Sequence, residues 1–211
     1  MTSRQIAAFD FDGTLTNRDT LVPFMAKTCG AAAMAKALAG VAPLALKARS
    51  GRDKSGLHHR DVTKAALLRA LFTGRDASWL AEQGESYSRE LPKKLRQEMV
   101  EQVGWHRDHG HELVLVSASL GTYLRPFARD HGFDHVIAVE MQEDATGVLT
   151  GEMTGPNVRG PEKAIRIKAW LGEARPESMW AYGNSSGDTE LLAMADVPVW
   201  VGRAASKAAA T

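Results

Sequence analysis

The stretch IAAFDFDGTLT, residues 6–16, places two aspartates directly after a short apolar run. The run predicts a buried strand, and the Asp-Gly turn after it predicts a loop. Because residues i and i+2 of an extended chain point to the same side, we expect Asp10 and Asp12 to enter one crevice. Gly13 would let backbone N–H groups approach a bound anion. Two adjacent carboxylates repel each other unless a cation shares them, so the stretch also implies a metal ion.

Strand-like and helical patterns alternate along the second half of the chain. Such alternation predicts an α/β fold, a doubly wound parallel sheet with helices on both faces. Residues 20–109 are helical throughout and too long for one crossover, so they predict a helical cap inserted into a core of residues 1–19 and 110–203. A flexible tail, residues 204–211, would follow. The expected strands are residues 6–9, 112–116, 135–139, 179–182 and 197–201, with helices at 121–130, 163–171 and 189–195 and a hairpin within 140–154.

Further polar residues lie where these strands end or where a helix begins. In open parallel sheets the ligand crevice lies beyond the carboxyl ends of the strands. Ser117, with the N–H groups of Ala118 and Ser119, would therefore face an oxyanion or a phosphate, although Ser119 would equally cap the next helix. Taken singly, Lys163 is an ordinary solvated lysine and Asp188 an ordinary helix cap.

The order of these segments resembles the haloacid dehalogenase superfamily, in which four motifs recur at successive strand ends. The chain supplies DFDGT at residues 10–14, then Ser117, then Lys163, then GNSSGD at residues 183–188. The resemblance is closest to the subfamily with a helical cap after the first motif, which contains the phosphoserine phosphatases. Within it, VSASL (116–120) and the hairpin after it look like a branch that includes phosphatidylglycerophosphatase C-type proteins. The resemblance implies a Rossmann-like core and a Mg2+-dependent phosphatase.

The resemblance also implies a role for each motif residue. Asp10 would be the nucleophile that forms an aspartyl-phosphate, and Asp12 would protonate the leaving alcohol and later deprotonate the attacking water. Ser117 and Lys163 would hold phosphate oxygens. Mg2+ would be bound by Asp10, by Asp12 through its backbone carbonyl, and by the fourth motif. The fourth-motif ligands would be Asn184 and Asp188, and the bound phosphate would also meet Gly13, Ala118 and Ser119.

Asn184 departs from the family pattern, which usually has an aspartate at this position. An amide oxygen can still bind Mg2+ but removes one negative charge, so we expect weaker metal binding, with Asp188 taking more of the load. Two alternatives to hydrolysis stay open. One is an inactive anion-binding protein that docks an acidic partner through the basic cap, and the other is a phosphotransferase with an acceptor pocket that excludes water.

The cap leaves two substrate classes open. Asp19 lies where phosphoserine phosphatases carry an acid that meets the substrate's amino group, although it could equally cap the next helix. The arginine that holds the substrate carboxylate in those enzymes has no clear counterpart; Lys64 and Arg69 are the candidates. We therefore expect hydrolysis of a small phosphorylated metabolite, phosphoserine-like, or alternatively of a lipid head group such as phosphatidylglycerophosphate.

Charge is unevenly distributed in this chain of 211 residues and net charge +1. Residues 26–75 hold ten Lys and Arg against two Asp. A field of this sign attracts a phosphorylated substrate or an acidic membrane surface. We expect no nucleic-acid ligand, and the sequence indicates no partner protein.

Cysteine content and hydropathy bear on location. Cys29 is the sole cysteine, which rules out an intrachain disulfide. Residues 31–48 are apolar, but Lys36, Pro43 and Lys47 interrupt them, so we expect them to fall short of the roughly 20 apolar residues of a membrane span. With a strand expected almost at Met1 and no room for a leader, we predict a cytoplasmic protein with, at most, peripheral membrane contact.

Overall fold

A five-stranded parallel sheet forms the centre of the molecule. The structure, a computed structural model, describes residues 4–49 and 58–202, so the predicted tail at 204–211 lies outside the described residues. The strand order is β3-β2-β1-β6-β7, which confirms the predicted α/β architecture. β1 is central, and its continuous apolar run is typical of a parallel strand buried on both faces. The strands are β1 (Gln5–Phe9), β2 (Glu112–Leu120), β3 (His135–Val139), β6 (Ser178–Gly183) and β7 (Val197–Trp200).

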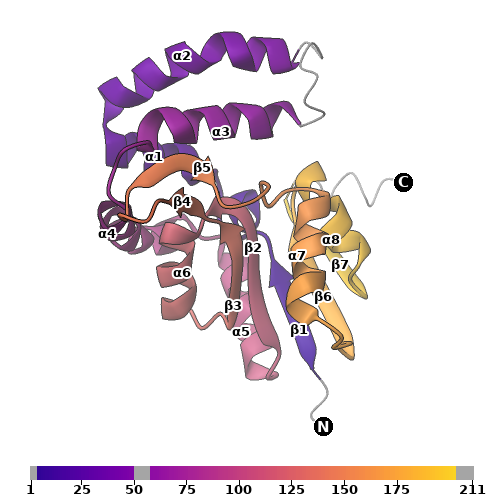
Figure 1. Ribbon diagram of the computed structural model, residues 1–211. Helices are drawn as coiled ribbons and strands as arrows, with labels where there is room; N and C mark the ends of the chain where they lie inside the picture. Colours follow the sequence, from indigo (N-terminus) through magenta and orange to yellow (C-terminus); the bar gives the residue numbers. More distant parts are fainter. Residues whose placement is uncertain (1–3, 50–57, 203–211) are drawn as a thin grey trace.

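Helices cover the sheet and form a separate layer beyond its carboxyl edge (Figure 1). α2 and α3 lie side by side in this outer layer, with α1 beneath them. The helices before β2 are α1 (Leu21–Cys29), α2 (Ala31–Arg49), α3 (His59–Phe72), α4 (Ala77–Ser88) and α5 (Gln97–Asp108), with a short turn η2 (Leu91–Lys94). Those after β2 are α6 (Gly121–Asp130), α7 (Pro161–Leu171) and α8 (Thr189–Ala193).

A hairpin joins the sheet to the helical insertion. β4 (Met141–Glu143) and β5 (Leu149–Met153) pair antiparallel, as the sequence predicted for this segment. β5 packs against α3, and Arg69 on α3 forms a salt bridge of 2.6 Å with Glu152. The insertion is therefore held to the sheet by the hairpin as well as by the two chain crossings.

The helix α5 belongs by its packing to the sheet. His106 of α5 is fully buried and meets the rings of Phe9 and Tyr182 edge-on, with centroids 5.8 and 5.6 Å away. Because α5 covers one face of β1 and β6 in this way, we propose that the cap ends near residue 95 rather than at 109.

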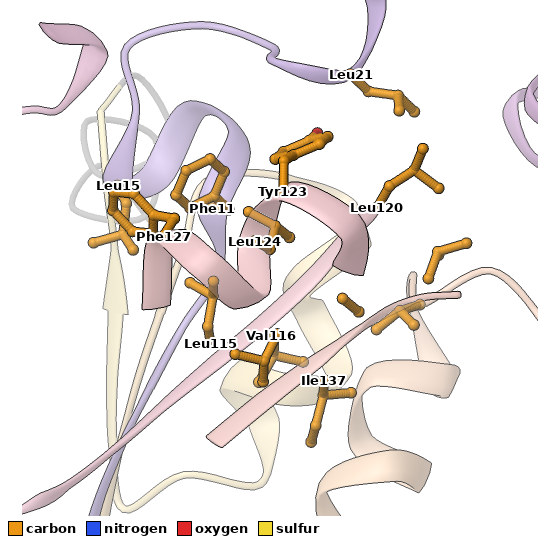
Figure 2. Packing of buried hydrophobic residues seen from close by; sticks show 14 of the residues in the cluster. Phe11, Leu15, Leu21, Leu115, Val116, Leu120, Tyr123, Leu124, Phe127 and Ile137 are labelled. Carbon is orange, nitrogen blue, oxygen red and sulfur yellow. The ribbon is translucent and has the colours of Figure 1, made fainter. Parts of the chain in front are cut away.

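The loop after β1 is fixed by aromatic packing. Figure 2 shows Phe11 and Leu15, the first and last residues of the irregular turn η1 (Phe11–Leu15), lying over Phe127 and Leu124 of α6. The Phe11 and Phe127 rings meet at 5.1 Å and 70°. Since both η1 side chains are buried, the loop that carries the two aspartates is held by the core on its apolar side.

The sequence analysis predicted that residues 31–48 fall short of the length and apolarity of a membrane span, and by length and composition this prediction was wrong. Ala31–Ala48 is one continuous helix with a mean hydropathy of 1.3, long and apolar enough by length and composition alone to cross a membrane. Pro43 lies inside the helix without ending it, and the two lysines are too few to lower the average below that of a span. Only 17% of this stretch is buried.

Candidate active site

The predicted polar residues meet in one cavity at the carboxyl edge of the sheet. Its volume is about 630 Å3. The loop after β1, the end of β2, the start of α7 and the turn η3 (Ser186–Asp188) form the floor, and residues of α1 and α3 form the roof. Asp10, Asp12, Asp19, Ser117 and Lys163 all line it, with Ala118, Ser119, Asn184 and Asp188.

A buried ion-pair cluster forms the deepest part of the floor. The Lys163 ammonium lies 2.5 Å from Asp10 Oδ1 and 2.6 Å from Asp188 Oδ1, and it is only 2% exposed. Burial opposes the charge on Lys163, but the two carboxylates hold its pKa above the ordinary value. Lys163 is thus an ion-pair partner and not the solvated lysine that the sequence alone would suggest.

Asp10 begins the loop at the end of β1. Its Oδ2 accepts a hydrogen bond of 2.7 Å from Thr14 Oγ1, while Oδ1 faces Lys163. Burial raises the pKa of Asp10, and Lys163 opposes that rise. The carboxylate is therefore oriented on both oxygens, by a donor from its own loop and by one from α7.

Asp12 occupies a different environment in the same cavity. Its Oδ1 accepts from the backbone N–H and hydroxyl of Thr20 at 2.7 and 2.6 Å, and its Oδ2 accepts from the Ser119 hydroxyl. All three donors are neutral, so burial dominates and raises the pKa of Asp12 to about 7, with the Asp19 charge adding to the rise. Asp12 can therefore exist in both protonation states near neutral pH.

The structure distinguishes the roles of Ser117 and Ser119, which the sequence left open. Ser117 Oγ accepts from the Ser119 N–H at 3.0 Å and is 1% exposed. The helix α6 begins after Leu120 without a side-chain cap, so the interpretation of Ser119 as its cap was wrong. β2 continues past residue 116 to Leu120, which turns the Ser119 hydroxyl toward Asp12 instead.

The fourth motif is built around Asp188. A capping box joins Ser185 and Asp188 in η3, and Asp188 Oδ2 accepts from the N–H groups of Asn184 and Ser185 at 3.1 and 3.0 Å. Burial raises the pKa of Asp188, but Lys163 outweighs it and holds the pKa below the ordinary value. A Cβ at Gly183 would come within 2.9 Å of Asp188 Cγ, so the close approach requires glycine.

Asn184 lies against the first motif. A Cβ at Gly13 would overlap the Asn184 amide, and Gly13 has φ +82°. Both the conformation and the space therefore favour glycine at position 13. The loops that hold Asp10 and Asn184 are adjacent across the cavity floor.

The oxygen donors at the floor fit a magnesium ion. Among residues 4–49 and 58–202, no three His, Cys, Asp or Glu side chains cluster as metal ligands. Mg2+ needs only one or two carboxylates, since it keeps several waters. Asp10 and the Asn184 amide oxygen suit it as hard donors. Both oxygens of Asp10 and both of Asp188 accept hydrogen bonds in this structure, and carboxylate oxygens have further lone pairs with which to bind a cation.

The residues predicted to recognise the substrate differ in whether they border the cavity. Asp19 lines the cavity, and its Oδ1 accepts from Val22 N at 3.0 Å, as expected for a residue that caps a helix. Lys64 also lines the cavity, whereas Arg69 is bound to Glu152 on the hairpin. Of the two predicted candidates for an anion-binding residue, Lys64 alone borders the cavity.

Thr14, Thr20 and Asn157 are among the residues of the site that the sequence analysis missed. Thr14 and Thr20 lie near the first motif, where a hydroxyl within reach of an aspartate is a weak signal. Asn157 bridges two residues of the roof helix α3: its Oδ1 accepts from Lys64 Nζ at 2.6 Å, and its Nδ2 donates to Asp61 at 2.7 Å. Nothing in the sequence around residue 157 indicates this bridge.

Comparison with known proteins places this geometry in a family. The model of the haloacid dehalogenase-like hydrolases matches residues 7–193. Protein CicA of Caulobacter vibrioides (strain NA1000 / CB15N) is 32% identical over 193 residues, which cover 90% of this chain and 83% of CicA.

Solved structures agree in fold. A protein of unknown function from Bordetella pertussis Tohama I superposes with a TM-score of 0.72 at 22% identity, covering 99% of this chain and 96% of that one. A probable phosphoserine phosphatase from Vibrio cholerae superposes with a TM-score of 0.65 at 16% identity, covering 92% of this chain and 55% of that one.

Proposed function

Because the chain belongs to the haloacid dehalogenase-like hydrolases, we propose that it is a phosphomonoester hydrolase that forms an aspartyl-phosphate on Asp10. The observation that carries the proposal is the contrast between the two aspartates of one loop. Asp10 is ion-paired with Lys163, while Asp12 meets only neutral donors and has a pKa of about 7. Burial raises the pKa of both carboxyls, so the difference lies in their partners. The Lys163 cation opposes the rise at Asp10 and favours the ionised form that a nucleophile needs, whereas the neutral donors leave Asp12 able to exchange a proton.

The reaction then divides between these side chains. An Asp10 oxygen attacks phosphorus, the bond to the leaving alcohol breaks, and Asp12 gives that alcohol its proton. Asp12 next takes a proton from water, which attacks the acyl-phosphate, releases phosphate and frees Asp10. Lys163 and the Ser117 hydroxyl border the place where charged phosphate oxygens would lie, and they would stabilise them.

Magnesium is the proposed cofactor, held by Asp10 and the Asn184 amide oxygen, with the Asp12 backbone carbonyl and Asp188 nearby. When bound, it would neutralise charge on the phosphoryl group, as metal ions do in phosphoryl transfer. The buried Lys163–Asp188 pair supports this assignment, because it leaves Asp10 with only part of the Lys163 charge as compensation.

The charges of the roof favour a small zwitterionic leaving group. Asp19 and Lys64 both border the cavity, and they are opposite in charge when Lys64 is protonated, as an amino acid substrate would require; burial lowers the pKa of Lys64 to about 7. Lipid head groups are the second candidate, favoured by the exposed apolar helix α2. Asp19→Asn should raise the KM for phosphoserine and leave the KM for glycerol phosphate unchanged.

Phosphate release from phosphoserine, sugar phosphates, glycerol phosphate and phosphatidylglycerophosphate, with magnesium and then with EDTA, tests the proposal. Asp10→Asn should lower turnover at least about a thousandfold and Asp12→Asn about a hundredfold or more. Asp144→Asn, in the exposed hairpin turn, is the matched control and should act as wild type. Substantial turnover by folded Asp10→Asn would rule out the covalent mechanism, and silence across the panel would favour an anion-binding protein.

A further inference from the structure

The outer face of α2 exposes an apolar stripe. Leu38, Ala42 and Leu46 follow one another at intervals of one helical turn and are all exposed, Leu38 at 48% and Leu46 at 74%. The adjoining face, centred about 100° around the helix axis from the stripe, holds Met34, Ala37 and Val41, which are buried in the core that α2 shares with α1 and α3. The helix therefore uses one apolar face for folding and leaves a second one uncovered, the outer stripe (Leu38, Ala42, Leu46).

Positive charge accompanies the outer stripe. Lys36 and Lys47 are eleven residues apart, about three helical turns, so they lie along the same edge of the exposed face. No Asp or Glu occurs between residues 31 and 49. An exposed apolar stripe flanked by lysines is the pattern of a helix that lies in a membrane interface.

We propose that α2 docks the protein on an anionic membrane, lying parallel to the surface with the outer stripe in the head-group and acyl boundary. The lysine edge would face lipid phosphates. Two observations favour this occupant over others. A second copy docked through the same face would bring the lysines of two α2 helices together, and α2 has no acidic residue to pair with them. A membrane-spanning α2 would have to withdraw Met34 and Val41 from the core.

Docking would bring the cavity to the bilayer. α1 and α3, which pack against α2, also contribute Leu21, Met25 and Lys64 to the cavity wall. The docking itself needs no turnover, so it stands or falls apart from the proposed function.

Co-sedimentation with vesicles tests the docking. We expect the full chain to bind phosphatidylcholine vesicles that contain phosphatidylserine, to bind pure phosphatidylcholine weakly, and to lose most binding at high salt. Leu38→Gln with Leu46→Gln should weaken binding about tenfold or more, and Lys36→Gln about fivefold. The matched control, Val100→Gln with Ile165→Gln, removes two exposed apolar side chains from α5 and α7 and should bind as wild type.

Each other outcome would overturn the proposal. Equal binding by the stripe variant and the control would place the contact elsewhere. A wild-type dimer in light scattering that the stripe variant abolishes would assign the face to a second copy. Bound protein that alkaline carbonate cannot extract would indicate a span. Turnover of a soluble phosphomonoester should be the same in all three variants, which separates this test from that of the proposed function.

Discussion

Charged side chains are ordinarily exposed and large apolar side chains buried. The cavity floor breaks the first part of this rule, and the helix α2 breaks the second. The floor buries three charged groups, Lys163, Asp10 and Asp188, each at most 6% exposed. α2 leaves Leu38 and Leu46 in solvent. Buried charges are tolerated only when paired, and exposed apolar stripes mark surfaces that something covers. Both departures lie at the surfaces proposed above to meet a ligand: the phosphomonoester at the cavity floor and the membrane at α2.

The largest effect should follow from breaking the buried cluster. Lys163→Met would leave Asp10 and Asp188 buried without a cation, which should lower the free energy of unfolding by about 3–5 kcal/mol and abolish turnover. The remaining carboxylates would then titrate at raised pKa values. The folded variant would hold protons that the unfolded chain has lost, so the deficit should grow as the pH rises from 5 to 8. Urea denaturation at several pH values measures it.

The control for Lys163→Met is Lys168→Met, an exposed lysine on the same helix. It should change the free energy of unfolding by no more than about 0.5 kcal/mol. A deficit in Lys163→Met that does not vary with pH would mean that lost packing, and not unpaired charge, causes it.

A second polar cluster of the sheet domain is buried in neutral form. His106 Nδ1 lies 2.7 Å from His111 Nδ1, and its Nε2 lies 2.8 Å from the Tyr182 hydroxyl. Tyr182 donates to Gln102, so His106 carries its proton on Nε2 and accepts on Nδ1. Burial, with His111 adding to it, lowers the pKa of His106 to about 4. The histidine cluster is buried without charge, whereas the buried charges at the cavity floor form ion pairs with one another.

This difference predicts acid sensitivity. Between pH 6.5 and about 4 the unfolded chain binds a proton at His106 that the folded chain refuses, so stability should fall as the pH falls through this window. The total loss should reach about 3 kcal/mol. His106→Gln, which hydrogen-bonds without titrating, should flatten that part of the profile, and exposed His109→Gln should not. Equal profiles for all three proteins would place the acid sensitivity elsewhere.

The order of strands and helices could be predicted from the sequence, because buried parallel strands read as apolar runs and helices as polar–apolar repeats. Asp10 and Asp12 could be found in the same way, from their place after a strand. Lys163 and Asp188 could not: each resembles an ordinary helix residue, and only the family resemblance brought them to Asp10. The role of Asn157 could not be predicted at all, because its partner Lys64 lies 93 positions away in the sequence. Contacts of that separation depend on how α3 seats over the sheet, which local patterns do not encode.

Asn184→Asp should have a moderate effect, in opposite directions with and without metal. A carboxylate at this position adds one negative charge beside Asp10, so magnesium affinity measured by calorimetry should rise about tenfold. In EDTA the same charge should repel Asp10 and lower the unfolding midpoint. Asn157→Asp, at a cavity residue that is bonded to Lys64 and not to Asp10, is the comparison variant and should leave magnesium affinity unchanged. Unchanged affinity in Asn184→Asp would mean that Asn184 is not a metal ligand.

The smallest effect should come from the exposed side of the comparison. Leu46→Ala should change the free energy of unfolding by no more than about 0.5 kcal/mol, because Leu46 is 74% exposed and alanine favours a helix. Leu68→Ala, on α3 and fully buried, should lower it by about 2–5 kcal/mol. If Leu46→Ala instead destabilised the protein as Leu68→Ala does, the outer stripe would already be covered in solution by another copy. A neutral effect on stability, together with weaker vesicle binding, would mean that these leucines serve docking and not folding.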